Sequence, residues 1–320
     1  MTSENVRELY KDGNTSRKIA LTLGGLAGRV GDIGRATRHD IVFILREAFA
    51  LGPPAIEYAL AQFGGKMVFD FDDAIYLPSL AYDNKIDRLR DWGKPAKVIA
   101  KSNTVIAGSQ YLADFANKTA KGRVEVLPTV VDHQVYAPRV PDFSGDGLTI
   151  GWIGTPRGSH YVADLMPVFQ SLHQKTPSLR FVFIGCAPFD PQGLPIEFRD
   201  WSLAREPQDI AEFDIGIMPL TDDEETRGKC GFKLIQYMSS GVTAVGSPVG
   251  ANNEIIEDGI SGLFADGLKG WEHSLSQVIT NHDLRAKLAR NGRTRAIAKY
   301  SLQYTAPKML KILQNTLSSP

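Results

Sequence analysis

Short apolar runs that recur between stretches of helical periodicity constrain the fold of this 320-residue chain more than any other feature. The runs have the length of buried strands, and they fall into two series. The first series comprises residues 41–45, 67–71, 104–107 and 124–127, and the second comprises residues 148–153, 181–184, 215–218, 242–245 and 262–265. Helical periodicity marks residues 55–63, 85–100 and 111–116, the last after the possible cap Ser109. Strands that alternate with helices predict parallel sheets covered on both faces, which is an α/β fold.

A linker separates the two series. Residues 137–147, APRVPDFSGDG, are rich in Pro, Gly and Asp and show no periodicity. We therefore expect two doubly wound parallel-sheet domains, over residues 1–140 and 145–300. Residues 301–320 are expected to form a C-terminal helix that returns to the first domain.

The beginning of the chain lacks the strand, glycine turn and helix with which a complete domain of this kind opens. Within residues 1–40, TLGGLAGRVG imitates such a turn, but no convincing strand precedes it. The first domain is therefore predicted to be shortened at its N-terminal end, with residues 1–40 in helices or loops. Either the chain starts inside a longer one, or the domain is naturally reduced.

Composition argues against several classes of function. Lys+Arg and Asp+Glu both number 36, and the resulting net charge of zero argues against a nucleic-acid partner bound through a large basic surface. The two cysteines, Cys186 and Cys230, indicate neither a disulfide framework nor a Cys/His zinc site. No run approaches the roughly 18 apolar residues that a membrane span needs. We expect a cytoplasmic protein that at most contacts the inner face of a membrane peripherally.

Residues 228–264, GKCGFKLIQYMSSGVTAVGSPVGANNEIIEDGISGLF, predict a helix, a buried strand and a second helix joined by glycine-rich corners. The first helix covers residues 231–239 and is closed by Gly241, and the second begins near Asn252 or Asn253, either of which would cap it. Free backbone N–H groups at such helix starts bind phosphate. This stretch is therefore the first candidate for an anion site.

Two lysines lie at the start of the first of these helices. They are Lys229 and Lys233, in a position where the helix dipole disfavours cations. A bound diphosphate would explain this placement, because N–H groups and ammonium groups would converge on the same negative charge. The alternative is that both lysines are solvated.

A glycine-containing turn over residues 151–159 is the second candidate for phosphate contact. It follows the first strand of the second domain and precedes a helix. The residues that would contact phosphate are Gly154, Thr155 and Arg157. Such turns also serve tight packing alone. The nearby aromatic residues Trp152 and Phe232 are predicted to pack in the core.

Three carboxylates, Asp70, Asp72 and Asp73, follow a strand of the first domain. Like charges at one strand end are costly unless they are solvated, bind a cation or act on a substrate. A structural or capping role, a substrate-facing role and a metal site all remain open.

The motifs above, in their order along residues 40–315, resemble the nucleotide-sugar-dependent glycosyltransferases of family 4, which have the two-domain Rossmann-like GT-B fold. In the second domain the resemblance is carried by VEVLPTVVDHQVYAP, IGWIGTP, FVFIG, FDIGIMPL, the stretch of residues 228–264, and ARNGR followed by AIAKYS. In the first domain it is carried by DIVFILREAF, VFDFDDAIY and VIAGSQYLADFA.

The resemblance implies a retaining transfer of a sugar from UDP or GDP to a glycan or lipid-linked acceptor, in glycan or cell-surface polysaccharide biosynthesis, without a metal or other cofactor. It implies catalytic roles for Asp72 and Lys233. The donor would be bound by Gly154, Thr155, Arg157, Lys229, Gly231, Phe232, Lys233 and Gln236.

Two departures from the family pattern affect these roles. Many relatives carry two glutamates where this chain has Gly228 and Gln236, although Gln236 could still form a hydrogen bond with a ribose hydroxyl. Relatives also often place a histidine where this chain has Asp72, although an aspartate can still accept a hydrogen bond from a sugar hydroxyl. Two alternatives are therefore kept: a catalytically weak or inactive GT-B protein that binds a nucleotide sugar or a partner, and another GT-B enzyme such as a nucleotide-sugar 2-epimerase.

Overall fold

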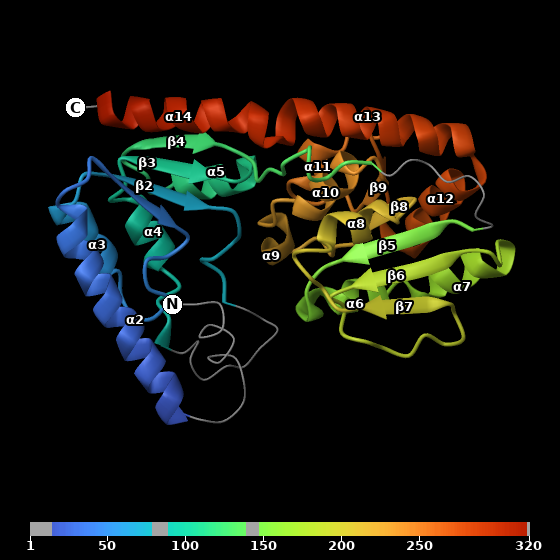
Figure 1. Cartoon of the computed structure of the whole chain (residues 1–320), viewed down its shortest axis with the longest axis horizontal. Coiled ribbons are helices and arrows are strands. Elements are labelled where there is room, and N and C mark those ends of the chain that lie inside the picture. The colour runs from blue at the N-terminus through green and yellow to red at the C-terminus, as the bar shows by residue number, and fades with distance from the viewer. Residues whose placement is uncertain (1–14, 79–88, 139–146, 319–320) are drawn as a thin grey trace. The chain divides into compact units, whose positions relative to one another are not determined.

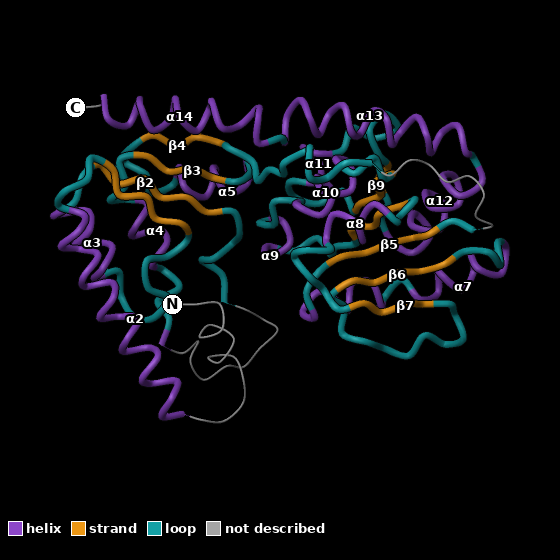
Figure 2. The backbone as a smooth tube through the Cα atoms, viewed as in Figure 1, coloured by secondary structure: helices purple, strands orange, loops and turns teal. Residues whose placement is uncertain are grey.

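The computed structural model describes residues 15–78, 89–138 and 147–318, and its elements are labelled in Figures 1 and 2. The chain divides into two compact units, Met1–Val126 with Leu310–Pro320, and Leu127–Met309. Each unit holds one sheet whose paired strands are all parallel in the described residues. The predicted α/β class with two doubly wound sheets is confirmed. The predicted linker core, residues 139–146, lies outside the described residues.

The first unit has a four-stranded sheet of order β1-β2-β3-β4. Its strands are β1 (Ile41–Leu45), β2 (Lys66–Phe71), β3 (Thr104–Ala107) and β4 (Arg123–Val126). Its helices include α3 (Ala55–Phe63), α4 (Lys94–Ile99) and α5 (Gln110–Asn117). The Ser109 side chain accepts a hydrogen bond from the Leu112 N–H at 3.4 Å, so its predicted capping role is confirmed.

A long helix, α2 (Thr15–Ala36), precedes β1. Within residues 15–40 the structure contains no strand, as the sequence predicted. The predicted helix over 85–100 is wrong in extent, because only Lys94–Ile99 is α-helical among its described residues. Pro95 favours this late start, because in the first turn of a helix its missing N–H costs no intrahelical hydrogen bond.

The second unit has a six-stranded sheet of order β10-β9-β8-β5-β6-β7. Its strands are β5 (Thr149–Ile153), β6 (Arg180–Ile184), β7 (Ile196–Arg199), β8 (Ile215–Met218), β9 (Thr243–Gly246) and β10 (Leu263–Phe264). The sequence analysis missed β7. Its four residues alternate apolar and charged at the edge of the sheet, so they lack the continuous apolar run of a central strand.

The helices of this unit are η2 (Pro156–Gly158), α6 (Ser159–Ala163), α7 (Met166–Lys175), α8 (Glu206–Ala211), α9 (Glu224–Arg227), α10 (Phe232–Ser239), α11 (Asn252–Ile255), α12 (Gly267–Thr280) and α13 (His282–Tyr300). The last helix is α14 (Leu302–Ser318). From Trp271 to Ser318 the chain forms helices and no strand, as predicted. From Leu310 onward α14 belongs to the first unit, where the Thr316 and Thr104 hydroxyls lie 2.7 Å apart in a buried contact.

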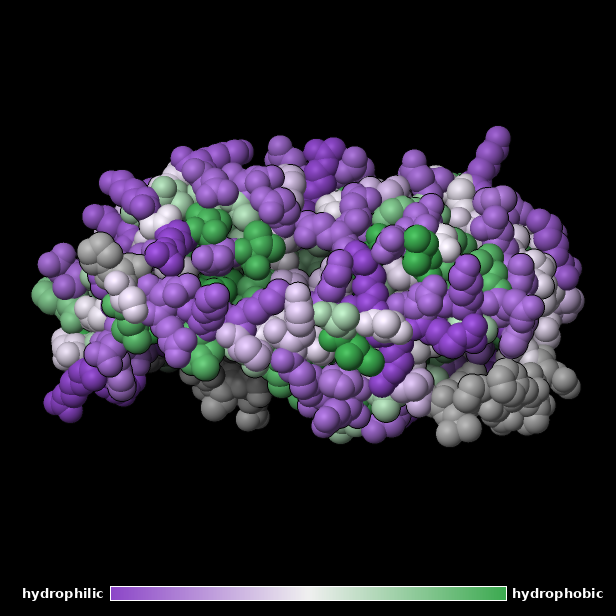
Figure 3. All heavy atoms as spheres, turned by 90° about the horizontal axis from the view of Figure 1, so that it is seen from above, coloured by the Kyte–Doolittle hydropathy of each residue, from purple (hydrophilic) through white to green (hydrophobic). Residues whose placement is uncertain are grey.

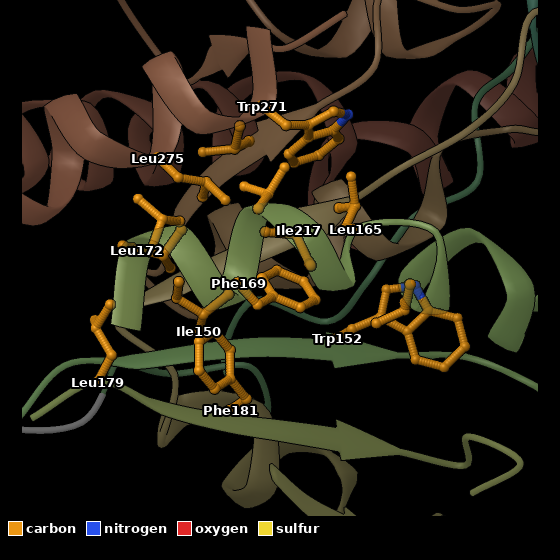
Figure 4. Packing of buried hydrophobic residues seen from close by; sticks show 14 of the residues in the cluster. Ile150, Trp152, Leu165, Phe169, Leu172, Leu179, Phe181, Ile217, Trp271 and Leu275 are labelled. Carbon is orange, nitrogen blue, oxygen red and sulfur yellow. The ribbon is translucent and has the colours of Figure 1, made fainter. Parts of the chain in front are cut away.

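The core of the second unit lies on both faces of its sheet. On one face, α7 packs against β5 and β6, and the rings of Phe169 and Phe181 lie 4.9 Å apart (Figure 4). On the other face, α10 buries Leu234, Ile235 and Tyr237. On the face shown in Figure 3, hydrophilic residues predominate and hydrophobic residues form separate patches. Among the described helices, none is long and apolar enough to cross a membrane.

Candidate active site

The carboxyl ends of β5, β6 and β7 are tied together by their own backbones. The Gly154 N–H donates to the Ile184 carbonyl at 3.0 Å, and the Gly185 N–H donates to the Arg199 carbonyl at 2.8 Å. Gly185 has φ +68°, and a Cβ there would lie 2.3 Å from the Gly154 carbonyl oxygen. Glycine at these positions allows three loops to meet at the edge where open parallel sheets bind ligands.

The glycine turn after β5 packs closely on Trp152, which is 1% exposed, as the sequence predicted. A Cβ on Gly154 would lie 2.3 Å from the Trp152 ring, and one on Gly158 would lie 3.3 Å from it. Packing therefore accounts for both glycines. The same packing brings the backbone of Thr155 and the start of η2 to the strand end, where they remain available to a ligand.

Helix α10 begins at Gly231, which has φ +66° and supplies no side-chain cap. A Cβ on Gly231 would lie 2.2 Å from Cδ1 of Ile255. Tyr237 anchors the helix, because its hydroxyl accepts from the Ile153 N–H at 3.1 Å and donates to the Ile217 carbonyl at 3.3 Å. The first N–H groups of α10 are thus held at the carboxyl ends of β5 and β8.

Two predictions for this region are wrong. Phe232 is 37% exposed and does not pack in the core. Phe232 is the first residue of α10 and directly follows Gly231, which has left-handed backbone angles. At this position its ring lies at the surface. Neither Asn252 nor Asn253 caps the second helix, since both lie inside α11, and Asn252 instead donates to the Ser247 carbonyl at 2.9 Å.

Lys233 lies one turn before Tyr237 and is only partly exposed. Its Nζ is 5.3 Å from the centre of the Trp152 ring, which is a cation–π distance. Burial, followed by the charge of Lys229, lowers the pKa of Lys233 to about 8. In the part of the chain that the structure describes, no carboxylate forms an ion pair with Lys233. A bound anion would relieve this desolvated charge.

Lys229 and Arg157 meet at one carboxylate. Arg157 Nη2 is 2.6 Å from Glu225 Oε1, and Lys229 Nζ is 3.7 Å from the same oxygen. Glu225 lies on α9, whose start is capped by Asp223 and Thr226. Two positive charges therefore share one negative charge beside Lys233, and the cluster carries a net excess of cations.

Gln236 belongs to a network that the sequence analysis missed. Its Nε2 donates to Glu206 Oε1 at 2.8 Å and to the Tyr136 hydroxyl at 3.1 Å. Tyr136 and Trp201 also donate to Glu206. Burial and the hydrogen bond to Glu206 raise the pKa of Tyr136. The amide nitrogen of Gln236 is thus engaged by the protein. The sequence alone could not identify Glu206 as part of this network, because acidic residues are also common in the first turn of exposed helices.

In the first unit, the three aspartates at the end of β2 have different surroundings. Arg46 lies 2.7 Å from Asp72 Oδ1, and its own φ of +61° is unusual for a residue with a side chain. Burial, followed by the charge of Asp72, raises the pKa of Asp70 to about 6. Asp73 accepts from the Ala74 N–H at 3.0 Å. Among the described residues, no group of three His, Cys, Asp or Glu side chains is placed to hold a metal ion.

Comparison with protein families identifies the segment of the chain that contains this site. Residues 147–281 match the family model described as Glycosyl transferases group 1. That segment includes every donor-binding residue that the sequence analysis named, and it excludes Asp72. Comparison with curated proteins finds no matching sequence.

Solved structures resemble most of the chain. Anabaena Alr3699/HepE, crystallised with UDP and glucose, has 16% identity and a TM-score of 0.68, with 89% of this chain and 80% of that chain covered. A glycosyltransferase from Rickettsia africae ESF-5 has 16% identity and a TM-score of 0.69, with 98% and 88% covered. Sucrose-phosphate synthase from Thermosynechococcus elongatus has 12% identity and a TM-score of 0.65, with 88% and 75% covered. The fold is that of the GT-B glycosyltransferases.

Proposed function

We propose that this protein is a family 4 glycosyltransferase that moves a sugar from UDP or GDP to an acceptor with retention at the anomeric carbon. The observation that carries the proposal is Lys233, a desolvated ammonium group that has no ion pair among the described residues and lies at the strand edge where ligands bind. Its segment matches the Glycosyl transferases group 1 model. The diphosphate of a sugar nucleotide would supply the negative charge that this ammonium group lacks.

The proposed chemistry depends on charge that develops as the diphosphate leaves. Lys233 stabilises that charge most strongly, because its ammonium group is already partly removed from water. Arg157 and Lys229 add positive charge once the diphosphate competes with Glu225 for them. Gly154 lines the turn, and the backbone N–H of Thr155 and those at the start of α10 complete the anion site. We propose that these groups serve without a metal ion.

The remaining roles are assigned by position. Gly231 allows the helix to start close to Ile255, and exposed Phe232 offers an apolar surface beside Lys233. Gln236 supports the donor site indirectly, through the hydrogen bond that it donates to Glu206. In the first unit, Asp72 accepts a hydrogen bond from an acceptor hydroxyl. We propose a glycan or lipid-linked acceptor of polysaccharide biosynthesis, reached from the cytoplasm at the inner face of a membrane.

The test is a thermal-shift screen of the purified protein against UDP-, GDP- and ADP-sugars, because a ligand that binds the folded state raises its unfolding temperature. The donor that binds is then incubated with acceptors, and the anomeric configuration of the product is determined. An α-linked product from an α-linked donor, formed equally in EDTA, supports the proposal. Absence of a shift with every donor would refute it.

A catalytically weak or inactive GT-B protein is the second candidate. It is favoured by Gly228, which offers no side chain, and by Gln236, whose amide nitrogen is already bonded to Glu206 and Tyr136. Donor binding without hydrolysis or transfer to any acceptor would select this candidate. Conversion of the donor sugar to its 2-epimer would instead indicate a different GT-B enzyme.

A further inference from the structure

Trp201 is an exposed aromatic residue that the protein holds in one orientation. It follows β7 at the carboxyl edge of the second unit's sheet, and it is 45% exposed. The only polar atom of its side chain, Nε1, donates a hydrogen bond to Glu206 Oε2 at 2.5 Å. With this donor satisfied by the protein, the exposed part of the ring is an apolar surface with a fixed tilt.

The group that fixes Trp201 is itself unusual. Glu206 is 8% exposed, and its partners Tyr136, Trp201 and Gln236 are all neutral donors. Among the described residues, no lysine or arginine forms an ion pair with it. A buried carboxylate without a cation costs free energy that hydrogen bonds only partly offset. Apolar packing would have stabilised the fold at lower cost, so the arrangement indicates a role in orienting Trp201.

Two independent connections lead from Trp201 to the proposed diphosphate site. Gln236 bonds Glu206 and lies three residues after Lys233, on the same side of α10. On the other side, a Cβ on Gly185 would lie 3.3 Å from the Trp201 Cβ and 2.3 Å from the Gly154 carbonyl oxygen. The indole therefore starts directly beside the glycine turn. It is placed to contact the part of a nucleotide that extends beyond the diphosphate.

We propose that Trp201 binds the aromatic base of the nucleotide by stacking, and that Glu206 is a positioning residue that holds the indole for this contact. The inference rests on the proposed function, because it assumes a nucleotide diphosphate at Lys233. An aromatic side chain stacks on the face of either a pyrimidine or a purine. Both UDP and GDP therefore gain affinity from Trp201, whereas inorganic pyrophosphate does not.

The test compares the dissociation constants of UDP and inorganic pyrophosphate, measured by calorimetry on the full-length chain. Trp201→Ala is expected to weaken UDP binding by about 5- to 150-fold, the range for loss of one base–aromatic stack, and to leave pyrophosphate binding within about twofold. Leu203→Ala is the matched control, because Leu203 lies in the same loop and is 73% exposed. It should leave both constants unaltered.

A second measurement does not depend on the stability of the alanine variant. UDP should quench the indole emission of the parent protein, and Trp201→Phe should abolish most of that quenching while it retains a ring for stacking. Glu206→Ala should weaken UDP binding and leave pyrophosphate binding unaltered. Glu206→Gln should bind UDP more tightly than Glu206→Ala, because its amide oxygen still accepts a hydrogen bond from Nε1 of Trp201.

The outcomes separate the two claims. A parent that binds neither UDP, GDP nor pyrophosphate overturns the proposed function and this inference together. A parent that binds UDP, with a Trp201→Ala variant that binds it equally well, overturns the inference and leaves the function standing. Equal loss of UDP and pyrophosphate affinity in Trp201→Ala also overturns it, because the residue would then support the whole loop.

Discussion

The strand ends of the two units carry opposite charges in similarly poor solvation. In the second unit, burial lowers the pKa of Lys233 to about 8. In the first, burial raises the pKa of Asp70 to about 6, with Asp72 and its partner Arg46 nearby. Each site holds an ion whose charge is costly without a ligand or a proton. This difference in sign matches the proposed function, in which the second unit binds the anionic diphosphate and the first unit accepts hydrogen bonds from neutral hydroxyls.

The largest expected effect tests the proposed role of the first unit, which is to bind the acceptor hydroxyl. Asp72→Asn should lower the turnover number by about 100-fold, the lower range for loss of a positioned acid–base group. The dissociation constant of UDP should stay within about twofold, because the residues proposed to bind the donor all lie in the second unit. Steady-state kinetics and calorimetry measure the two quantities.

Asp73→Asn is the control for this variant, since an asparagine oxygen still accepts from the Ala74 N–H. If Asp72→Asn lost turnover and UDP affinity in equal measure, the two sites would not be separable. A dependence of UDP binding on added Mg²⁺ or Mn²⁺ would argue for a metal role.

Lys233→Ala tests the second unit. Removing a charge-assisted contact should weaken UDP binding by about 1.5–3 kcal/mol in calorimetry. The unfolding temperature without ligand should change little, because the lost cation–π contact and the relieved desolvation oppose one another. Lys175→Ala is a matched control, since Lys175 pairs with Glu272 at the surface. A variant that binds UDP as tightly as the parent would exclude Lys233 from the phosphate site.

The same lysine predicts opposite trends for binding and stability. UDP affinity of the parent should fall as the pH rises through about 8, where Lys233 loses its proton. The ligand-free fold should instead gain stability between pH 8 and 10.5, because the unfolded state binds more protons there. Calorimetry measures the UDP affinity across this range, and urea unfolding measures the stability. If both quantities change with pH in the parent as stated and neither changes in Lys233→Ala, the lowered pKa belongs to Lys233. If UDP affinity and stability rose or fell together in the parent, this assignment would be contradicted.

Asp70→Asn should raise the free energy of unfolding by about 1–2 kcal/mol at pH 7.5, less than the full shift implies because Asp70 is partly exposed. The native state binds more protons than the unfolded state between pH 3.8 and 6, so the parent loses stability as the pH rises through this window. The variant should match the parent near pH 4. Urea unfolding measures the difference, with the exposed Asp114→Asn as control. A variant less stable than the parent at pH 7.5 would show that the Asp70 charge is used by the fold.

The smallest effect is expected for Lys229→Ala. It should weaken UDP binding by less than about 1 kcal/mol, because Lys229 is partly exposed and Arg157 remains at Glu225. Calorimetry beside Lys233→Ala ranks the two lysines. A larger loss for Lys229→Ala than for Lys233→Ala would reverse the roles that burial assigns to them.

Sequence reasoning predicted the parts of the molecule that depend on local pattern. The bounds of β1, β3 and β8 agree with the predicted runs, because β-branched and aromatic residues in short buried segments favour strands wherever they occur. Ser109 was recognisable as a cap because its partner, Leu112, is three residues away. The late start of α4 and the edge strand β7 were missed where proline or alternating polarity interrupted the pattern.

The sequence by itself thus determined the α/β class, the two parallel sheets and the glycine turns, because each depends on residues a few positions apart. Only the tertiary structure decided which ions are costly and which side chains meet. Gln236 contacts Tyr136 and Glu206 across 100 and 30 positions, and Arg157 reaches Glu225 across 68. The lowered pKa of Lys233 likewise needs the surrounding atoms that remove water from it. Solvation and long-range contacts are properties of the packed chain, so no local pattern contains them.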